Sequence, residues 1–334
     1  MKRRLAFWTL LPIALLAALV GGLTLYTVAT AADEAPFQHM IGTSSRDVSP
    51  AFAPFRNADG LEPRAIEAAF AGVSERLRGY RMVVVPGYLT DGFLLTNRIG
   101  ITDYFGSQIA TLQADGFDVT RAPVDTEAPV ADNAAVLARL VADSDRPVCF
   151  ISHSKGGLDV LAFLVAADAT TRAKIACWVA LQSPFHGTPI ADLAAGSKPL
   201  RAIADPLARE LGGAGGSLDD LTVAVRAAWM ADHDAAVRAV VAGIPTLAVA
   251  TFVGADDAVT PNLYMQPAWN WMRTRDLPND GLVPVASAVL PDTRYIILSG
   301  LDHTDTIANS TVFDRPLDRL LFLKAVLAQT LAER

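Results

Sequence analysis

Hydrophobic and polar residues alternate along the chain in blocks whose lengths predict strands and helices in turn. Short apolar runs rich in β-branched residues predict strands at 82–85, 117–124, 147–151, 175–181, 246–253 and 294–298. Longer stretches with apolar residues three or four positions apart predict helices at about 63–79, 101–114, 131–142, 156–167 and 317–331. This alternation is typical of right-handed crossovers and of a parallel sheet covered by helices on both faces. The predicted fold class is therefore α/β.

The alternation stops after Pro184, since about 190–244 reads as helical with no strand. A glycine-rich run at 212–216 lacks the Gly-Lys-Ser/Thr ending of a phosphate-binding loop, which favours a flexible joint with Ser217 capping the next helix. Residues 33–62 contain several prolines and little periodicity, which predicts a linker that wraps onto the domain. The main domain is expected at 63–334.

The first 32 residues differ from the rest of the chain. Lys2, Arg3 and Arg4 precede 28 residues without a charge. The apolar stretch at 5–28 reaches the roughly 20 residues that span a bilayer, which predicts a membrane anchor. Ala-Thr-Ala at 29–31 has the small-x-small form that signal peptidase accepts, so a cleaved signal peptide stays open. Both alternatives export the domain to the periplasm or the exterior, because the basic residues stay on the cytoplasmic side.

Net charge limits the possible partners. The chain carries 28 Lys and Arg against 35 Asp and Glu, a net charge of −7, and removing the three cations of residues 1–32 leaves −10. An acidic domain without a cluster of cations is a poor ligand for phosphates, so nucleic-acid binding is excluded.

Cysteine is rare in this chain. Cys149 and Cys177 lie inside two of the predicted strands, and two residues are too few for a disulfide framework. They are expected to be buried free thiols.

The first candidate catalytic segment is Phe-Ile-Ser-His-Ser-Lys-Gly-Gly at 150–157, between a predicted strand and a predicted helix. A serine at such a sharp turn is exposed above the carboxyl edge of the sheet, and the helix N-terminus faces a developing oxyanion. The turn needs small residues two positions before and after the nucleophile, and Ser152 and Gly156 meet this need. Ser154 is the candidate nucleophile; the alternative is an ordinary serine-rich connection.

A serine nucleophile needs a general base, and the chain has five histidines. His303 follows the last predicted strand, in a loop at the edge where Ser154 lies, and is the candidate. The others are less suitable by position: His39 is in the linker, the turn is expected to aim His153 elsewhere, His186 comes too early in the chain order, and His233 fits a solvated helix face.

The third member of such a site is a carboxylate that accepts the imidazole N–H and fixes its tautomer. Asp280 lies in Asn-Asp-Gly-Leu-Val-Pro at 279–284, and Asp256 and Asp257 lie just beyond the predicted strand 246–253. The spacing alone leaves both open.

From about residue 81 to its end the chain resembles the α/β-hydrolase family, and within it bacterial lipases and esterases. The order Ser154, Asp280, His303 is that family's order. Residues 279–283 match the Asn-Asp-Gly-(Leu/Ile)-Val segment that holds the acid in these lipases, so the resemblance favours Asp280 and keeps Asp257 as the alternative acid. It also implies a mostly parallel central sheet covered by helices on both faces, and a helical lid at about 190–243.

The resemblance further implies an oxyanion hole. The backbone N–H of Lys155, directly after the nucleophile, is one donor. Tyr88, in the loop 85–89 after the first core strand, matches the lipase position that supplies the other, although lipases usually have His-Gly where this chain has Pro86-Gly87. Residues 182–189 are similar to a lipase loop that lines the cleft.

Metal and cofactor predictions are negative. In related lipases an aspartate at the position of Asp305 binds structural calcium, but the sequence offers no second ligand, and Asp302 and Asp305 also fit ordinary surface acids. No metal and no cofactor is predicted.

The predicted function is cleavage of carboxylic esters through an acyl-serine intermediate. A hydrophobic or lipid-like ester is favoured, because apolar side chains of the insertion and of the segment before Asp280 would form a wall for an acyl chain: Trp229, Met230, Tyr264, Met265, Trp269 and Trp271. An acyltransferase, thioesterase, depolymerase or amidase would use the same residues. The non-enzymatic alternative is an inactive, membrane-tethered binding module.

Overall fold

The computed structural model describes residues 45–57, 60–88, 90, 102–196, 217–310 and 317–332. The predicted N-terminal anchor or signal, His39 and the glycine run at 212–216 lie outside these residues. Within the described ranges, no helix combines the length and the apolar character that crossing a membrane requires.

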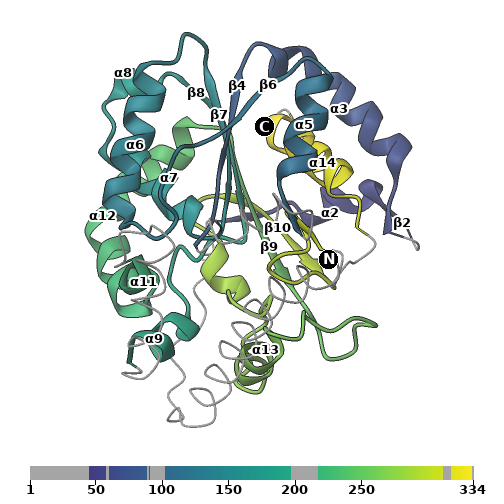
Figure 1. Cartoon of the computed structure of the whole chain (residues 1–334), viewed down its shortest axis with the longest axis vertical. Coiled ribbons are helices and arrows are strands. Elements are labelled where there is room, and N and C mark those ends of the chain that lie inside the picture. Colours follow the sequence, from purple (N-terminus) through teal and green to yellow (C-terminus); the bar gives the residue numbers. More distant parts are fainter. Residues whose placement is uncertain are drawn as a thin grey trace, which may run out of the picture.

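A seven-stranded sheet forms the centre of the described structure (Figure 1). Its spatial order is β1-β10-β9-β8-β7-β4-β6, and each neighbouring pair is parallel. In chain order the strands are β1 (Arg46–Asp47), β4 (Arg81–Val85), β6 (Asp118–Arg121), β7 (Val148–His153), β8 (Ile175–Leu181), β9 (Thr246–Phe252) and β10 (Arg294–Ser299). Parallel strands covered on both faces are apolar throughout, and all six residues of β7 are buried.

Successive residues of one strand serve two hydrophobic clusters, because side chains alternate between the two faces of a sheet. Met82 and Val84 belong to the cluster under α3 (Pro63–Arg78), α5 (Gly106–Ala114) and α14 (Arg319–Leu331). Val83 and Val85 belong to the cluster under α6 (Val130–Ala142), α7 (Lys155–Ala166) and α12 (Val223–Gly243). Figure 1 shows these two groups of helices on opposite sides of the sheet.

Short elements complete the described fold. The N-terminal segment contributes α2 (Ser49–Phe52), the 3₁₀ turn η1 (Ala53–Phe55), β2 (Arg56–Asn57) and β3 (Gly60–Leu61), and α8 (Ala169–Arg172) follows α7. Phe52 and Phe55 are buried in the first cluster. Beyond the carboxyl ends of β8 and β9 lie α9 (Pro189–Gly196), α11 (Ser217–Asp220), α13 (Gln266–Arg273) and the 3₁₀ turn η2 (Val285–Ala288). The described parts of 190–243 are helical and contain no strand.

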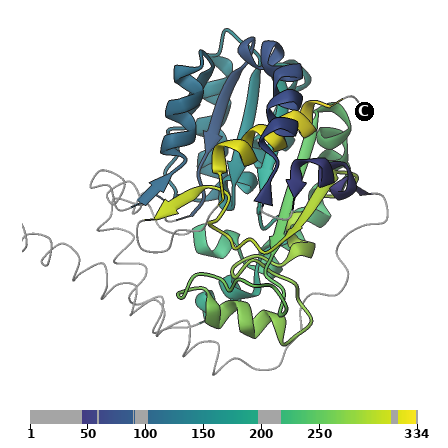
Figure 2. The same ribbon diagram turned by 90° about the vertical axis from the view of Figure 1, so that its right-hand side faces the viewer.

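The helix predicted at 101–114 is partly wrong. Residues Thr102–Tyr104 form strand β5, which pairs antiparallel with β11 (Ala308–Ser310), and α5 begins only at Gly106. Phe105 has a left-handed φ of 59°, which no α-helix interior permits, and the Asp103 carboxylate accepts the Ser107 N–H at 3.0 Å. In Figure 2 the blue β5 arrow lies beside the yellow β11 arrow, away from the main sheet.

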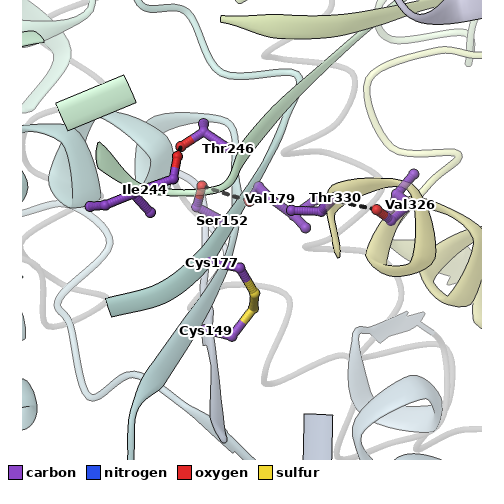
Figure 3. The surroundings of a disulfide bond; sticks show 8 residues. All are labelled: Cys149, Ser152, Cys177, Val179, Ile244, Thr246, Val326 and Thr330. Atoms are coloured by element: carbon purple, nitrogen blue, oxygen red, sulfur yellow. Dashed lines mark hydrogen bonds between the residues drawn. A yellow bond between two sulfur atoms is a disulfide. The ribbon is translucent and has the colours of Figure 1, made fainter. Parts of the chain in front are cut away.

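The expectation of free thiols is also wrong, since Cys149 and Cys177 form a disulfide (Figure 3). The two residues are register partners in the neighbouring strands β7 and β8, with their Cα atoms 4.5 Å apart. Their side chains belong to the same hydrophobic cluster, on one face of the sheet. Strand pairing therefore brings the sulfur atoms within bonding distance, which the sequence positions do not reveal.

Candidate active site

Ser154 occupies the sharp turn between β7 and α7. Its φ of 53° and ψ of −129° lie outside the regions that a serine ordinarily adopts. The turn is held because the Ser154 N–H donates to the Leu181 carbonyl at 2.9 Å and the Gly157 N–H donates to the Ser154 carbonyl at 3.0 Å. The side chain is half-buried. A strained serine at the start of a helix is the backbone arrangement predicted for the nucleophile.

Small residues surround this turn for steric reasons. A Cβ atom at Gly156 would collide with the carbonyl oxygens of Val85, the last residue of β4, and of Pro86, which follows it. Ser152 is fully buried, and its hydroxyl accepts the indole N–H of Trp178 at 2.8 Å. Ser152 therefore fills the place where such turns usually have glycine, with its polar group satisfied.

We expect Gly156→Ala to lower the free energy of unfolding by about 1–3 kcal/mol, because the backbone of Val85 and Pro86 must move away from the new methyl group. The matched control is Gly72→Ala in α3, where a Cβ meets nothing within 4 Å. That change should raise the free energy of unfolding by about 0.5–1 kcal/mol through helix propensity. Urea unfolding of the two variants measures both, and equal effects would contradict the steric argument.

His303 and Asp280 form a buried pair. The His303 Nδ1 atom lies 2.8 Å from Asp280 Oδ2, and the His303 N–H donates to the Asp280 carbonyl at 2.9 Å. The second carboxylate oxygen accepts the N–H groups of Leu282 and Val283 at 3.0 and 2.7 Å. With Nδ1 donating to the carboxylate, the neutral ring has its basic nitrogen at Nε2, as a general base requires.

The alternative acid, Asp257, lies elsewhere. It is half-buried in the loop after β9, and its Oδ2 accepts the Gly254 N–H at 2.6 Å. The carboxylate bonded to the His303 ring is that of Asp280. The geometry favours Asp280 over Asp257 as the third member of the site.

The loop after β4 lies directly against Ser154, the candidate nucleophile. A Cβ atom at Gly87 would lie 2.8 Å from the Cβ of Ser154, so only glycine allows this approach. The Gly87 N–H donates to the Tyr104 hydroxyl at 3.0 Å, and its carbonyl accepts the Thr90 hydroxyl at 2.9 Å. Tyr88 follows in the same loop and is half-buried. Its role as an oxyanion donor stays a prediction.

Lys155 begins α7, and its side chain is used inside the protein. The ammonium group lies 3.0 Å from the carboxylate of Asp159, which also accepts the amide N–H of Asn133 at 3.0 Å. Burial raises the pKa of Asp159 to about 6, although Lys155 and Asn133 act in the opposite direction. Because this ion pair holds the ammonium group, the candidate oxyanion donor of Lys155 is its backbone N–H.

Two polar residues make contacts in the site that the sequence does not predict. Gln182, at the carboxyl end of β8, donates its amide to the Asp302 carbonyl at 2.8 Å and to Asp280 Oδ2 at 3.3 Å, while its carbonyl accepts the Thr306 hydroxyl at 2.8 Å. His153, expected to point away, contacts the His303 loop, since its Nε2 lies 2.9 Å from the His303 carbonyl. The position of Gln182 directly after an apolar strand is a sequence signal that could have identified it. The position of His153 in the site depends on a contact between residues 150 positions apart.

Asp302 and Asp305 are not surface acids. Both are buried in the turn that contains His303, where the Asp302 carboxylate accepts the N–H groups of Thr304 and Asn262, each at 2.9 Å. Asp305 accepts the Asp302 N–H at 2.7 Å. These bonds satisfy the backbone of a tight turn and so determine where His303 lies. The described residues contain no cluster of three or more His, Cys, Asp or Glu with the arrangement of a metal site.

The other two described histidines pack against neighbouring residues away from the His303–Asp280 pair. His233 lies on α12, where its ring stacks on Trp229 with centroids 4.3 Å apart. His186 is buried, and its Nε2 lies 3.2 Å from the Val289 carbonyl. Burial lowers the pKa of His186 to about 4.

We expect the free energy of unfolding to fall as the pH is lowered from about 6.5 to about 4, because of His186. The unfolded chain takes up a proton near pH 6.5 and the folded protein does so only near 4, so acid stabilises the unfolded state by up to about 3 kcal/mol. His186→Gln keeps an N–H donor without a titrating ring. Urea unfolding at pH 7 and 4.5 should show the wild type losing about 2–3 kcal/mol more than the variant; parallel losses would contradict this origin.

The apolar residues expected to form one wall belong to different clusters. Met230 packs against the sheet. Trp271 packs with Leu277 and with the partly buried Ile190 of α9 and Val223 of α12. The segment before Asp280 therefore contacts the insertion at residues 190–243, beyond the carboxyl edge of the sheet where Ser154 and His303 lie.

No protein-family model and no curated protein matches the chain. Several solved structures are similar to the chain. The metagenomic carboxyl esterase MGS0156 is 23% identical with a TM-score of 0.60, covering 76% of each chain. The mature Bacillus licheniformis lipase BlEst2 is 20% identical with a TM-score of 0.50, covering 68% of this chain and 85% of the lipase. Staphylococcus hyicus lipase is 14% identical with a TM-score of 0.52, covering 75% of this chain and 96% of the lipase.

These similarities, together with the parallel sheet and its two helical layers, define the chain's class: it has the α/β-hydrolase fold. The fold predicted from the sequence is confirmed.

Proposed function

We propose that the protein is a serine hydrolase that cleaves carboxylic esters through an acyl-serine intermediate. The observation that supports this most strongly is the buried His303–Asp280 hydrogen bond of 2.8 Å, in a loop that contacts the strained nucleophile turn through His153. The similar structures are those of a carboxyl esterase and two lipases, which favours the same reaction class.

In this mechanism the Nε2 of His303 removes the proton of the Ser154 hydroxyl, and the oxygen attacks the ester carbonyl carbon. The N–H groups of Lys155 and Tyr88 stabilise the resulting oxyanion. The imidazolium, stabilised by Asp280, then protonates the departing alcohol as the carbon–oxygen bond breaks. Water attacks the acyl-serine with His303 as the base again, which releases the acid and restores Ser154.

We further propose a hydrophobic or lipid-like ester. The short helices α9 and α11 of 190–243 lie beyond the carboxyl edge of the sheet, where the α/β-hydrolase resemblance places a lid, whereas α12 packs on one face of the sheet. Leu263, 70% exposed, and Val259 belong to the loop after β9 that also contacts Asp302 through Asn262. Exposed apolar side chains beside the site favour a hydrophobic substrate.

Hydrolysis of p-nitrophenyl esters with short and long acyl chains, with and without detergent micelles, tests this proposal. We expect the long-chain esters to be preferred and micelles to increase the rate. A preference for short soluble esters would contradict the lipid-like substrate while keeping the esterase, and no turnover of any ester would contradict the enzyme. Added alcohols separate hydrolysis from acyl transfer, because a transferase makes a new ester from them.

We also propose that the domain is exported, either anchored by residues 1–32 or released after signal cleavage. The Cys149–Cys177 disulfide supports an oxidising compartment, since cytosolic thiols are kept reduced. N-terminal sequencing of the exported protein distinguishes the two forms: a start near Ala32 means a cleaved signal, whereas a start at Met1 means an anchor.

A further inference from the structure

The His153 ring connects two loops that belong to different parts of the site. It is buried, with 3% of its surface exposed, and has a partner at each nitrogen. Nε2 lies 2.9 Å from the backbone carbonyl of His303, and Nδ1 lies 2.8 Å from the Tyr104 hydroxyl. The same hydroxyl accepts the N–H of Gly87 at 3.0 Å. A continuous chain of hydrogen bonds therefore runs from the loop after β4 to the loop that contains His303.

The direction of each bond follows from the chemistry of its atoms. A carbonyl oxygen only accepts, so His153 Nε2 must carry a hydrogen. Burial, and then the proximity of His303, hold the pKa of His153 well below its usual range, so the ring is neutral and Nδ1 is an acceptor. The Tyr104 hydroxyl therefore donates to Nδ1 while it accepts from Gly87.

Tyr104 is itself held by the His303 side of the molecule. It pairs with Ala308 in the β5–β11 ladder, and the next residue, Phe105, donates its N–H to the Ile307 carbonyl at 2.9 Å. The Tyr104 and His153 rings meet edge to face with centroids 5.8 Å apart, and the His153 and His303 rings lie 4.7 Å apart. Ring contacts and hydrogen bonds thus join the same three residues, with His303 bonded through its backbone carbonyl.

We propose that His153 and Tyr104 are positioning residues, which set the distance between the oxyanion loop and His303 across the nucleophile. This inference rests on the proposed function. Gly87 precedes the predicted donor Tyr88 and packs on Ser154, so a shift of Gly87 moves that donor relative to the reacting carbonyl. Donors act only at hydrogen-bond distance from the oxyanion, and a misplacement of about 1 Å is enough to cost roughly 100-fold in rate.

Three variants test the hydrogen bonds of the His153 ring separately. Tyr104→Phe removes the hydroxyl between Gly87 and His153. His153→Gln places an amide N–H near the position of Nε2 and so keeps the donor to His303, whereas His153→Asn places an amide oxygen near Nδ1 and so keeps the acceptor for Tyr104. Tyr80→Phe is the matched control, because Tyr80 packs at the edge of the first hydrophobic cluster.

For ester hydrolysis we expect Tyr104→Phe and both His153 variants to lower kcat about 10- to 100-fold, with KM changed less than about threefold, because the loss concerns the transition state. Tyr80→Phe should equal the wild type. In the double variant Tyr104→Phe/His153→Gln the losses should not multiply, because both changes break the same bond. Rates are divided by the concentration of active sites, titrated with a fluorophosphonate, and folding is checked by near-ultraviolet circular dichroism.

The outcomes are distinct. An unchanged kcat in Tyr104→Phe and His153→Asn, in an active wild type, would overturn the positioning role and leave the proposed function standing. If the kcat losses multiply in the double variant, the positioning role is overturned as well. The same holds if each loss of kcat is explained by a smaller fraction of folded protein. A folded wild type that neither reacts with the fluorophosphonate nor hydrolyses any ester would contradict the proposed function and this inference with it.

Discussion

Replacing Ser154 with alanine is expected to lower kcat/KM for an ester by on the order of 10⁴-fold or more, while the protein stays folded. The alanine lacks the oxygen that forms the acyl-enzyme, and no other group in the proposed mechanism can replace it. The side chain is half-buried and its backbone, which holds the turn together, is unchanged. Initial rates on a p-nitrophenyl ester, with circular dichroism as the folding check, measure the loss.

The matched control for this variant is Ser74→Ala, which removes a hydroxyl from the α3 helix far along the chain from the site. It should leave kcat/KM within about twofold of the wild type, because that hydroxyl donates to the Ala71 carbonyl of the same helix, at 3.0 Å. A Ser154→Ala variant that keeps more than a few per cent of the activity would contradict the nucleophile assignment.

Asp280→Asn is expected to have the second-largest effect, a fall in kcat on the order of 10⁴-fold. The carboxylate accepts the His303 Nδ1–H at 2.8 Å and two backbone N–H groups with its other oxygen. Those two donors hold the oxygen of an asparagine amide in the same place, so its NH₂ group faces His303. The ring then adopts the tautomer with the hydrogen on Nε2, where it cannot accept the serine proton.

Asp257→Asn is the control for this substitution and decides between the two candidate acids. Its carboxylate bonds to the Gly254 N–H rather than to His303, so kcat should stay within about threefold of the wild type. Measured pH–rate profiles of both variants give the comparison. The reverse pattern, with activity lost in Asp257→Asn and kept in Asp280→Asn, would assign the acid to Asp257.

The sequence predicts the central sheet well because its strands are buried on both faces and therefore appear as unbroken apolar runs, such as 82–85 and 147–151. The candidate triad is predictable for a related reason, since Ser154 and His303 each follow such a run and the carboxyl ends of parallel strands meet at one edge. The sequence alone leaves Asp280 and Asp257 open, and the similarity of residues 279–283 to a lipase segment favours Asp280, which the structure brings together with His303.

What the sequence does not predict depends on contacts between distant residues. The two-residue and three-residue strands β1 and β5 have no pattern of their own, because pairing with β10 and β11 defines them. The Cys149–Cys177 disulfide follows from the register of β7 on β8. His153 is next to Ser154 in sequence, yet its place in the site depends on Tyr104 and the His303 carbonyl, which only the folded chain brings near.

The most direct test of the central claim is covalent labelling of the full-length protein with a fluorophosphonate, followed by intact mass measurement and peptide mapping. Such a probe reacts with a serine that a neighbouring base activates, whatever ester the enzyme prefers. We predict one adduct per chain, on the hydroxyl of Ser154, and none in the Ser154→Ala variant. A folded wild type that takes up no probe, or an adduct that persists in Ser154→Ala, would contradict the assignment of Ser154 as the nucleophile.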